Sequence, residues 1–342
     1  MARIVGGITT SHIPAIGAAL ARELQDTPYW KPFFDGYVPV RRWLEAVRPD
    51  VAVVIYNDHG LSFFLDHIPT FAVGAAASYP NEDSGWGLEV LPEVRGDIEL
   101  SWHVIESLVA DEFDITMCQE MKVDHGFMVP LMTMWPGVSE WPIRAVPIAV
   151  NTVQHPIPSA ARCYKLGQAL GRAIESYPED IKVVILGTGG MSHQLQGERA
   201  GFINKRFDMM FMEKVVDDPE SLARLSNAEL VEQAGSEGVE LIMWLAMRGA
   251  MTRGASVVHS HYHIPVSNTA AGVLVIENTA SVVVSGFSRT AALAGPPALA
   301  GPAALAGPHR SSPEPGPPDP SPPEGGHYKS VRLKADTTGQ SA

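Results

Sequence analysis

The sequence has few cysteines, no surplus of basic residues and no long apolar run. Among its 342 residues there are two cysteines, Cys118 and Cys163. Two cysteines cannot build a disulfide framework, which favours a reducing cytoplasm. The formal net charge of −13 argues against a nucleic-acid-binding protein, because there is no surplus of basic residues to neutralise phosphates. No stretch approaches the roughly 18 apolar residues of a membrane span. We therefore expect a cytoplasmic protein that binds neither nucleic acid nor membrane.

The composition changes near residue 288. Ala-Leu-Ala-Gly-Pro occurs three times, starting at Ala292, Ala298 and Ala304, and a Pro/Ser/Glu-rich stretch follows. Glycine and proline disfavour helix and sheet, and no periodicity there could bury a face. We predict one globular domain over residues 1–287 and a disordered tail over residues 288–342. The alternative for the tail is a linker or partner-binding segment.

Apolar, β-rich runs alternate with amphipathic stretches along the globular part. The run at 51–56 is continuously apolar, which is typical of a strand covered on both faces. This alternation predicts an α/β fold: a single domain with a mixed, largely parallel central sheet flanked by helices. The predicted strands are residues 3–8, 51–56, 70–74, 145–150, 182–187 and 272–276, and the helical patterns include 159–177 and 237–251.

A histidine follows each of three predicted strands. His12 comes after the first, His59 after the strand at 51–56, and His193 closes the Gly-Thr-Gly-Gly-Met-Ser-His run at 187–193. The carboxyl ends of parallel strands share one edge of a sheet, where ligands bind. We therefore expect these three side chains to converge. Any one of them alone could be an ordinary polar loop residue.

A carboxylate would complete a metal site, and Glu240 is the best candidate. In the helical pattern it shares a face with Met243, Trp244 and Met247, and this face is expected to be buried. A buried carboxylate is costly unless it meets a cation or stays protonated. Glu237 lies in the first turn, where the helix dipole favours a negative charge and no further role is needed. Two histidines and one carboxylate match the facial triad of non-haem Fe(II) oxygenases.

Two further histidine groups compete with this interpretation. His259, His261 and His263 alternate, so a strand would place them on one face, where they could hold zinc. No fourth ligand for zinc is evident. The Asp-His-Gly of residues 58–60 recurs at 124–126. His125 is therefore either a ligand, a proton donor beside the metal or a turn residue.

Six segments occur in a characteristic order. They are Gly-Ile-Thr-Thr-Ser-His-Ile-Pro-Ala at 7–15, Tyr-Asn-Asp-His at 56–59, Val-Asp-His-Gly at 123–126, Gly-Thr-Gly-Gly-Met-Ser-His-Gln-Leu-Gln-Gly at 187–197, Gly-Ser-Glu-Gly-Val-Glu-Leu at 235–241, and Tyr-His-Ile-Pro at 262–265 with Ser-Asn-Thr-Ala at 267–270. From residue 1 to about 276, the sequence resembles the catalytic β subunits of protocatechuate 4,5-dioxygenases, which are class III extradiol ring-cleavage dioxygenases. Residues 259 and 261 and the tail have no counterpart in that pattern.

The resemblance implies roles for the histidines and the glutamate. His12, His59 and Glu240 would bind Fe(II). His193 would be the catalytic acid/base, for which an imidazole is suited near neutral pH. His125 would be a second catalytic residue and would also bind the substrate, close to the bound diol.

The resemblance also implies a substrate site and a partner. Ser267 and Asn268 would hydrogen-bond the carboxylate of a small aromatic acid. Such neutral donors suit an acidic protein, whose net charge would otherwise repel this substrate. A small helical α subunit would cap the active site in an α2β2 assembly.

The expected reaction is the Fe(II)-dependent insertion of both atoms of O2 into protocatechuate at the 4,5 bond. The product would be 4-carboxy-2-hydroxymuconate 6-semialdehyde, in the catabolism of lignin-derived aromatic acids. Gallate and 3-O-methylgallate are alternative substrates that differ at one ring substituent. A non-catalytic metal-binding homologue and a zinc hydrolase are the alternatives from other classes. The presence of His193 beside the triad argues against the former, and oxygen uptake would distinguish the latter.

Overall fold

The computed structural model describes residues 1–82 and 91–278, which belong to one compact unit. The predicted boundary between residues 287 and 288, and the predicted disordered tail, lie outside the described residues. Within the described ranges, no helix has both the length and the apolar character that crossing a bilayer requires.

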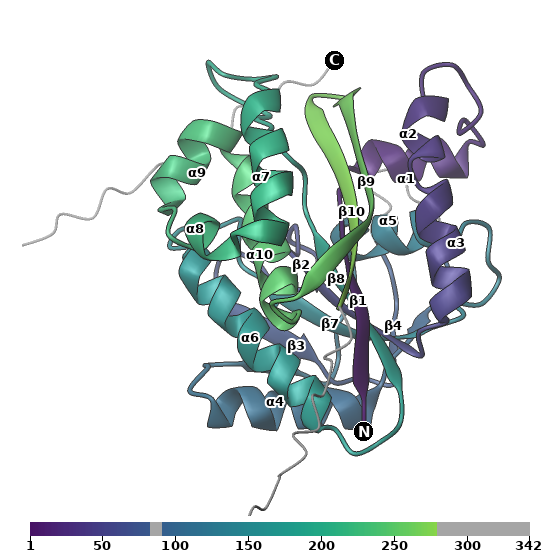
Figure 1. The fold of residues 1–342 in the computed structure, drawn as a ribbon, viewed down its shortest axis with the longest axis vertical. Coiled ribbons are helices and arrows are strands. Elements are labelled where there is room, and N and C mark those ends of the chain that lie inside the picture. The colour runs from purple at the N-terminus through teal and green to yellow at the C-terminus, as the bar shows by residue number, and fades with distance from the viewer. Residues whose placement is uncertain (83–90, 279–342) are drawn as a thin grey trace, which may run out of the picture. The chain divides into compact units, whose positions relative to one another are not determined.

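An eight-stranded sheet forms the centre of this unit (Figure 1). Its strand order is β6-β3-β7-β2-β8-β1-β10-β9. The four neighbours β7, β2, β8 and β1 run parallel, whereas β3–β7, β1–β10 and β10–β9 are antiparallel. The prediction of a mixed, largely parallel sheet is confirmed. The strands are β1 (Arg3–Thr10), β2 (Val51–Tyr56), β3 (Phe71–Gly74), β6 (Thr116–Cys118), β7 (Arg144–Val150), β8 (Lys182–Thr188), β9 (Ala255–Val266) and β10 (Thr269–Asn278), with β4 (Ser78–Tyr79) and β5 (Val94–Arg95) forming a separate pair.

Helices cover both faces of the sheet. Alternate residues of β2 enter two different apolar cores, since Val53 lies in one and Val54 in the other. One core includes α4 (Ile98–Ala110), α6 (Ala160–Ser176), α7 (Lys205–Asp217), α8 (Pro219–Ala223), α9 (Asn227–Ala234) and α10 (Leu241–Ala250). The other includes α1 (Pro14–Ala21), α2 (Lys31–Asp35), α3 (Val38–Val47) and α5 (His125–Met134). Because both faces are covered, β2 is buried along its whole length.

The two helical patterns of the sequence have different outcomes. The pattern at 159–177 is the single helix α6, whose N-cap Ser159 accepts a hydrogen bond from the backbone N–H of Arg162. The pattern at 237–251 divides into a 3₁₀ turn, η2 (Glu237–Glu240), followed by α10. Gly238 lies inside the turn, and a Cβ there would come within 2.5 Å of the Cβ of Ala234. The close packing therefore requires glycine, which weakens a regular α-helix at this point.

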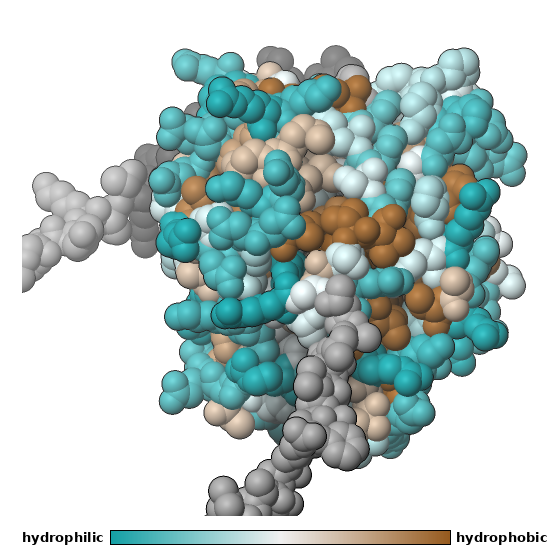
Figure 2. All heavy atoms as spheres, viewed as in Figure 1, coloured by the Kyte–Doolittle hydropathy of each residue, from teal (hydrophilic) through white to brown (hydrophobic). Residues whose placement is uncertain are grey.

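One face of the described unit is mostly polar (Figure 2). Figure 2 shows hydrophilic side chains over most of one face, with an apolar patch across the region where β9 runs in Figure 1. Among the described side chains of β9, the exposed apolar ones are Val257, Val258 and Ile264. This strand is the last of the sheet and pairs only with β10 in the described part of the chain.

Candidate active site

The carboxyl ends of β1, β2 and β8 bring the candidate residues together. These three strands are parallel neighbours in the order β2-β8-β1, so their ends lie at the same edge. His12 follows β1, His59 follows β2, and the loop at 189–193 follows β8. Gly189 has a φ of +135°, and a Cβ there would lie 2.8 Å from the Cβ of Glu240. A glycine is needed for Glu240 to approach the strand ends this closely.

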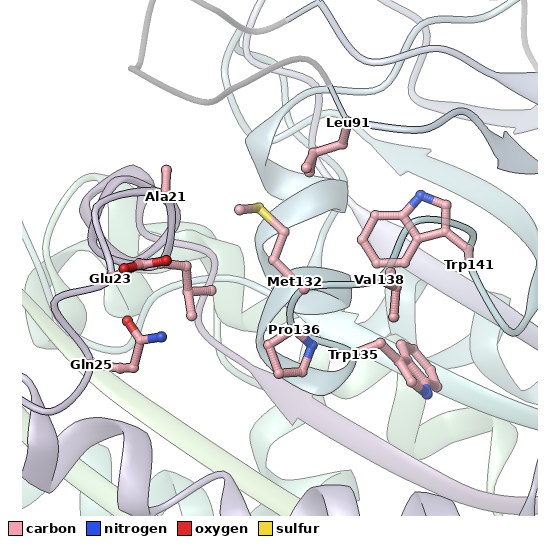
Figure 3. A pocket seen from close by; sticks show the side chains of 11 residues that line it. Ala21, Glu23, Gln25, Leu91, Met132, Trp135, Pro136, Val138 and Trp141 are labelled. Carbon is pink, nitrogen blue, oxygen red and sulfur yellow. The ribbon is translucent and has the colours of Figure 1, made fainter.

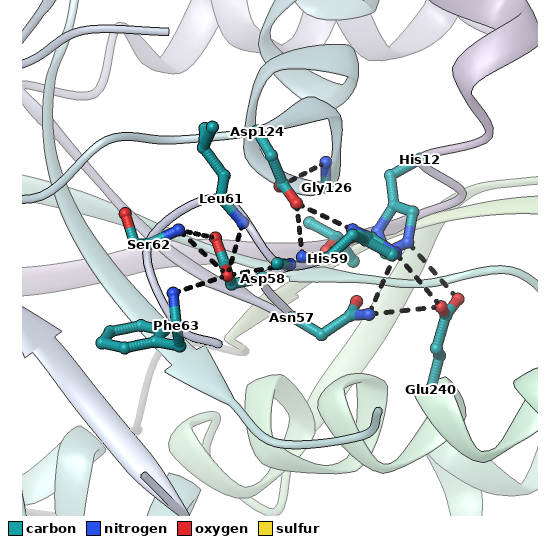
Figure 4. A network of polar contacts seen from close by, with 12 residues as sticks. His12, Asn57, Asp58, His59, Leu61, Ser62, Phe63, Asp124, Gly126 and Glu240 are labelled. Carbon is teal, nitrogen blue, oxygen red and sulfur yellow. Dashed lines mark hydrogen bonds and ion pairs between the residues drawn. The ribbon is translucent and has the colours of Figure 1, made fainter. Parts of the chain in front are cut away.

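His12, His59 and Glu240 form a compact group with the geometry of a metal site (Figure 4). One ligand atom from each lies within 4.8 Å of the others. The Nε2 atom of His12 is 3.4 Å from Oε2 of Glu240, and Nε2 of His59 is 3.8 Å from Oε1. His12 and Glu240 are 3% and 6% exposed. Two imidazole nitrogens and one carboxylate are a donor set that suits non-haem Fe(II).

Further hydrogen bonds fix the orientation of each ligand. Nδ1 of His12 is 3.0 Å from Oγ1 of Thr188, and Nδ1 of His59 donates to Asp124 at 2.8 Å. The backbone N–H of Gly190 donates to Oε2 of Glu240 at 2.7 Å. Because their Nδ1 atoms are engaged in this way, both imidazoles direct Nε2 towards the carboxylate. Such outer hydrogen bonds set the ring orientation of metal-binding histidines.

The histidines and carboxylates of this group shift one another's pKa values towards the charged forms. Burial lowers the pKa of His59, but Asp124 and then Glu240 outweigh burial and raise this pKa to about 10. Burial raises the pKa of Asp124, but His59 and His125 outweigh it and lower the pKa to about 2. The pKa of Glu240 is held well below its ordinary value, because His12 and His59 outweigh the effect of burial. Both carboxylates are thus anionic and ready to face a cation.

Asn57 provides a separate observation that fits a bound metal. Its Nδ2 atom lies 3.0 Å from Nε2 of His59 and 3.5 Å from Oε1 of Glu240. Its Oδ1 atom is buried and has no hydrogen-bond partner within the described residues. An unpaired buried acceptor is costly. A water or hydroxyl bound at the triad would supply the missing donor.

His125 and His193 lie beside the triad. The ring of His125 stacks on that of His59, with centroids 4.0 Å apart, and its centroid is 5.9 Å from that of His12. Nδ1 of His193 is 2.8 Å from the carbonyl oxygen of Met191. A carbonyl oxygen only accepts, so Nδ1 carries the hydrogen and Nε2 of the neutral ring is left to accept a proton.

The loop that carries His193 is hydrogen-bonded to a buried carboxylate. Asp208 on α7 is fully buried and accepts hydrogen bonds from the backbone N–H and the hydroxyl of Ser192, at 2.9 and 2.6 Å. It also accepts one from the hydroxyl of Tyr262 on β9, at 2.8 Å. Burial raises the pKa of Asp208, and the hydrogen bonds from Ser192 and Tyr262 oppose that shift. Asp208 therefore links the His193 loop to the β9–β10 hairpin.

These residues open into one cavity of about 350 Å³, a volume in the usual range for a small-molecule site. Ser267 contributes to its wall, whereas Asn268 is exposed and does not line it. The lining residues are His12, Ile13, Pro14, Ala15, His59, His125, Gly190, His193, Leu195, Glu237, Glu240, Ser267 and Thr269.

A second cavity, of about 400 Å³, lies between the end of α1 and the end of α5 (Figure 3). Its walls include Met132, Trp135 and Trp141, with Glu23 and Gln25 on the facing side. No histidine is among its described lining residues. The chemistry of the site is therefore in the smaller cavity.

The alternative zinc site on β9 is not assembled. His259, His261 and His263 share one face, as their alternation predicted, but they are absent from the groups of potential metal ligands among the described residues. Nε2 of His259 donates to the carbonyl oxygen of Gly36 at 2.7 Å. The rings of His261 and His263 stack with centroids 6.4 Å apart. These side chains pack against the α2 region and do not converge on a common point.

Three residues contribute to the site in ways that the sequence did not predict. Asp124 and Thr188 occur in the quoted motifs, but their contacts with His59 and His12 depend on distances across the fold. Glu237 was assigned to the helix dipole, yet its side chain lines the cavity. The sequence signal that could have identified it is its spacing of three residues from Glu240.

Comparisons with known proteins agree with this arrangement. Residues 6–274 match the family described as the catalytic LigB subunit of aromatic ring-opening dioxygenase. A gallate dioxygenase from Pseudomonas putida is 46% identical over 196 residues, which is 57% of this chain and 57% of that enzyme. A 2,3-dihydroxyphenylpropionate/2,3-dihydroxicinnamic acid 1,2-dioxygenase from Photorhabdus laumondii is 25% identical over 315 residues, covering 79% of this chain and 95% of that enzyme.

The fold also has a counterpart among solved structures. An uncharacterized protein from Escherichia coli K12 superposes with a TM-score of 0.51 at 15% identity, covering 79% of this chain and 99% of that protein. This likeness concerns the fold alone. The family match covers the strand-end histidines, Glu240 and most of the described sheet. The chain belongs to the family of catalytic LigB subunits of aromatic ring-opening dioxygenases.

Proposed function

We propose that this protein is an Fe(II)-dependent extradiol dioxygenase that opens the ring of gallate. The observation that carries the proposal is the opening of the His12, His59 and Glu240 group into the same cavity as His193. The 46% identity to a gallate dioxygenase supports gallate as the first substrate. Gallate therefore takes precedence over protocatechuate, the substrate first expected from the sequence.

The metal would be held by Nε2 of His12, Nε2 of His59 and the carboxylate of Glu240. Bound Fe(II) would supply one centre at which two neighbouring ring hydroxyls and O2 meet and exchange electrons. Asp124 would keep the Nδ1 proton of His59 in place, so that Nε2 stays directed at the metal position. Gly190 would do the same for the carboxylate of Glu240 through its backbone N–H.

His193 would move the proton that ring opening requires. Its Nδ1–H is held by the carbonyl of Met191, so Nε2 is the atom that accepts a proton from a substrate hydroxyl and later returns it. The side chain is 6% exposed, which limits exchange of that proton with bulk water. His125 lines the same cavity, and its ring stacks on that of His59.

The substrate carboxylate would be held by neutral donors. The described lining of the cavity has no lysine or arginine. Ser267 lies in the β9–β10 turn with a φ of 58° and is one of the residues that line the cavity. We assign the carboxylate to Ser267; Asn268, which is exposed and outside the cavity lining, stays a prediction from the sequence. A helical α subunit that caps this site stays a prediction of the resemblance.

The test is anaerobic loading with Fe(II), followed by oxygen uptake with gallate, protocatechuate and 3-O-methylgallate in parallel. We expect uptake of one O2 per ring, fastest with gallate. Uptake only with protocatechuate or 3-O-methylgallate would retain the chemistry and change the substrate. Hydrolysis of ester or amide substrates by a zinc-loaded sample without oxygen uptake would favour a hydrolase. Bound iron without uptake from any of the three acids would contradict the proposed activity of the chain alone.

A further inference from the structure

Glu237 and Glu240 occupy the two ends of the same 3₁₀ turn, η2. In a 3₁₀ helix, side chains at i and i+3 are eclipsed, and three residues advance roughly 6 Å along the axis. Both glutamates line the catalytic cavity. Glu240 faces the two histidines of the triad, so Glu237 presents a second carboxylate about one turn away from it.

Hydrogen bonds hold one oxygen of the Glu237 carboxylate and leave the other without a partner among the described residues. Its Oε2 atom accepts hydrogen bonds from the backbone N–H of Leu195 at 3.0 Å and from the hydroxyl of Ser236 at 2.6 Å. Its Oε1 atom has no hydrogen-bond partner in the part of the chain that the structure describes. Leu195 also lines the cavity, so this anchor lies at the cavity wall. Oε1 of this fixed carboxylate is therefore suited to accept a hydrogen bond from a ligand.

The charge around Glu237 indicates what kind of ligand group that is. The described cavity lining has no lysine or arginine that would pair with Glu237. A substrate carboxylate placed beside it would be repelled, whereas a ring hydroxyl would form a charge-assisted hydrogen bond. Glu237 therefore favours the orientation in which the acid group points elsewhere and a hydroxyl points towards it.

We propose that Glu237 is a specificity-determining residue that accepts a hydrogen bond from a third ring hydroxyl of the substrate. The inference rests on the proposed function and makes it more specific. With two neighbouring hydroxyls at the metal, the remaining hydroxyl of a trihydroxybenzoate is directed at Glu237. Protocatechuate has only hydrogen at that position. The methoxy group of 3-O-methylgallate has no proton to donate when it takes the same place. Glu237 thus selects trihydroxy over dihydroxy acids.

Anaerobic calorimetric titration of the Fe(II)-loaded full chain with gallate and with protocatechuate tests this, since it measures binding without turnover. The variants are Glu237→Gln, which removes the charge and retains an acceptor, and Glu237→Ala, which removes both. Glu232→Gln on α9 is the matched control, because that carboxylate is exposed and outside the cavity lining. Iron content and circular dichroism verify that each variant is folded and loaded.

We expect the wild type and Glu232→Gln to bind gallate about tenfold more tightly than protocatechuate, the lower end of what a hydrogen bond to a charged group provides. Glu237→Gln should reduce the ratio to about threefold, and Glu237→Ala to within about twofold, with protocatechuate affinity nearly unchanged. An unchanged ratio in Glu237→Ala, or an equal loss of affinity for both acids, would overturn the inference. If the wild type binds with the expected preference but consumes no oxygen, the catalytic proposal fails and the role of Glu237 in binding stands. If the wild type binds neither acid, both fail.

Discussion

Two groups of histidines in this molecule lie in opposite chemical surroundings. The group at the strand ends is His12, His59 and His193, with His125 of α5 beside them, and it meets two buried carboxylates. The row on β9, His259, His261 and His263, contacts a backbone carbonyl and its own members. The row is denser in sequence, yet only the strand-end group has the geometry of a metal site. Convergence of side chains from different strands matters more than their spacing along one strand.

The pKa of His59 is shifted in the opposite direction from those of His261 and His263. In the strand-end group, Asp124 and Glu240 outweigh burial and raise the pKa of His59 to about 10. In the row, burial lowers the pKa of His263, and burial followed by repulsion from His263 and His259 lowers that of His261. The surroundings of His59 favour a positive charge, whereas those of His261 and His263 disfavour it. The following predictions separate the two groups experimentally.

Removal of the carboxylate should have the largest effect. Glu240→Ala leaves two imidazoles without an anionic ligand, so we expect bound iron to fall from stoichiometric to background and turnover to be lost. His259→Ala should keep full iron content, since its contact is with a backbone carbonyl. Metal analysis after anaerobic loading and desalting measures both. Iron retained by Glu240→Ala but lost from His259→Ala would reverse the assignment.

Loss of the acid/base should affect rate and not metal content. His193→Ala is expected to lower kcat by roughly 10²- to 10⁴-fold, the usual contribution of a positioned proton donor. Iron content should stay stoichiometric, because His193 is not one of the three clustered ligands. Steady-state oxygen uptake with parallel metal analysis tests this, and His263→Ala serves as the control from the row. A His193→Ala protein without iron would contradict the assignment.

Neutralising Asp124 should have an intermediate effect. Asp124→Asn removes the charge that orients His59 but keeps an acceptor of similar shape. Metal affinity should fall by about 10- to 100-fold, as is typical for a residue that supports a ligand. Competition with a chelator of known affinity gives the value. An unchanged affinity would show that the stacking on His125 is sufficient to hold His59 in place.

The smallest effect is expected from the row on β9. The folded-state pKa of His261 lies below the ordinary 6.5, so its contribution to stability is complete above pH 6.5 and is lost as pH falls below that value. His261→Leu should reduce the drop in Tm between pH 7 and pH 5 by about 1–3 °C. His67→Leu is the control, because His67 is 89% exposed. A larger drop in the His261→Leu protein would contradict this account.

The sequence alone predicted the parts of the fold that depend on local pattern. Continuous apolar runs such as 51–56 identified the buried strands, because strands covered on both faces have no alternation. The helix α5 was not predicted, since all ten of its residues are buried and no polar face sets a period. The convergence of His12 and His59 followed from topology, because both lie at the carboxyl ends of parallel strands.

Contacts that depend on distance across the fold were beyond the sequence. The interaction of Asp124 with His59 joins residues far apart in the chain, and nothing in the local pattern sets it. The direction of Glu237 depends on a 3₁₀ turn where an α-helical pattern was expected. In an α-helix positions 237 and 240 are offset around the axis, whereas in the observed turn they are eclipsed. That change moves Glu237 from the helix end to the cavity wall.

The order in which the ligands occur along the chain has a consequence for biosynthesis. His12 and His59 leave the ribosome early, but Glu240 follows only after β8 and most of the helices have been made. Because β8 lies between β1 and β2, the two histidines are not spaced correctly until that strand is inserted. A nascent or truncated chain therefore cannot assemble the site. With the proposed ligands, metal uptake would be a late event that follows completion of the fold, and incomplete chains would not bind the metal at this site.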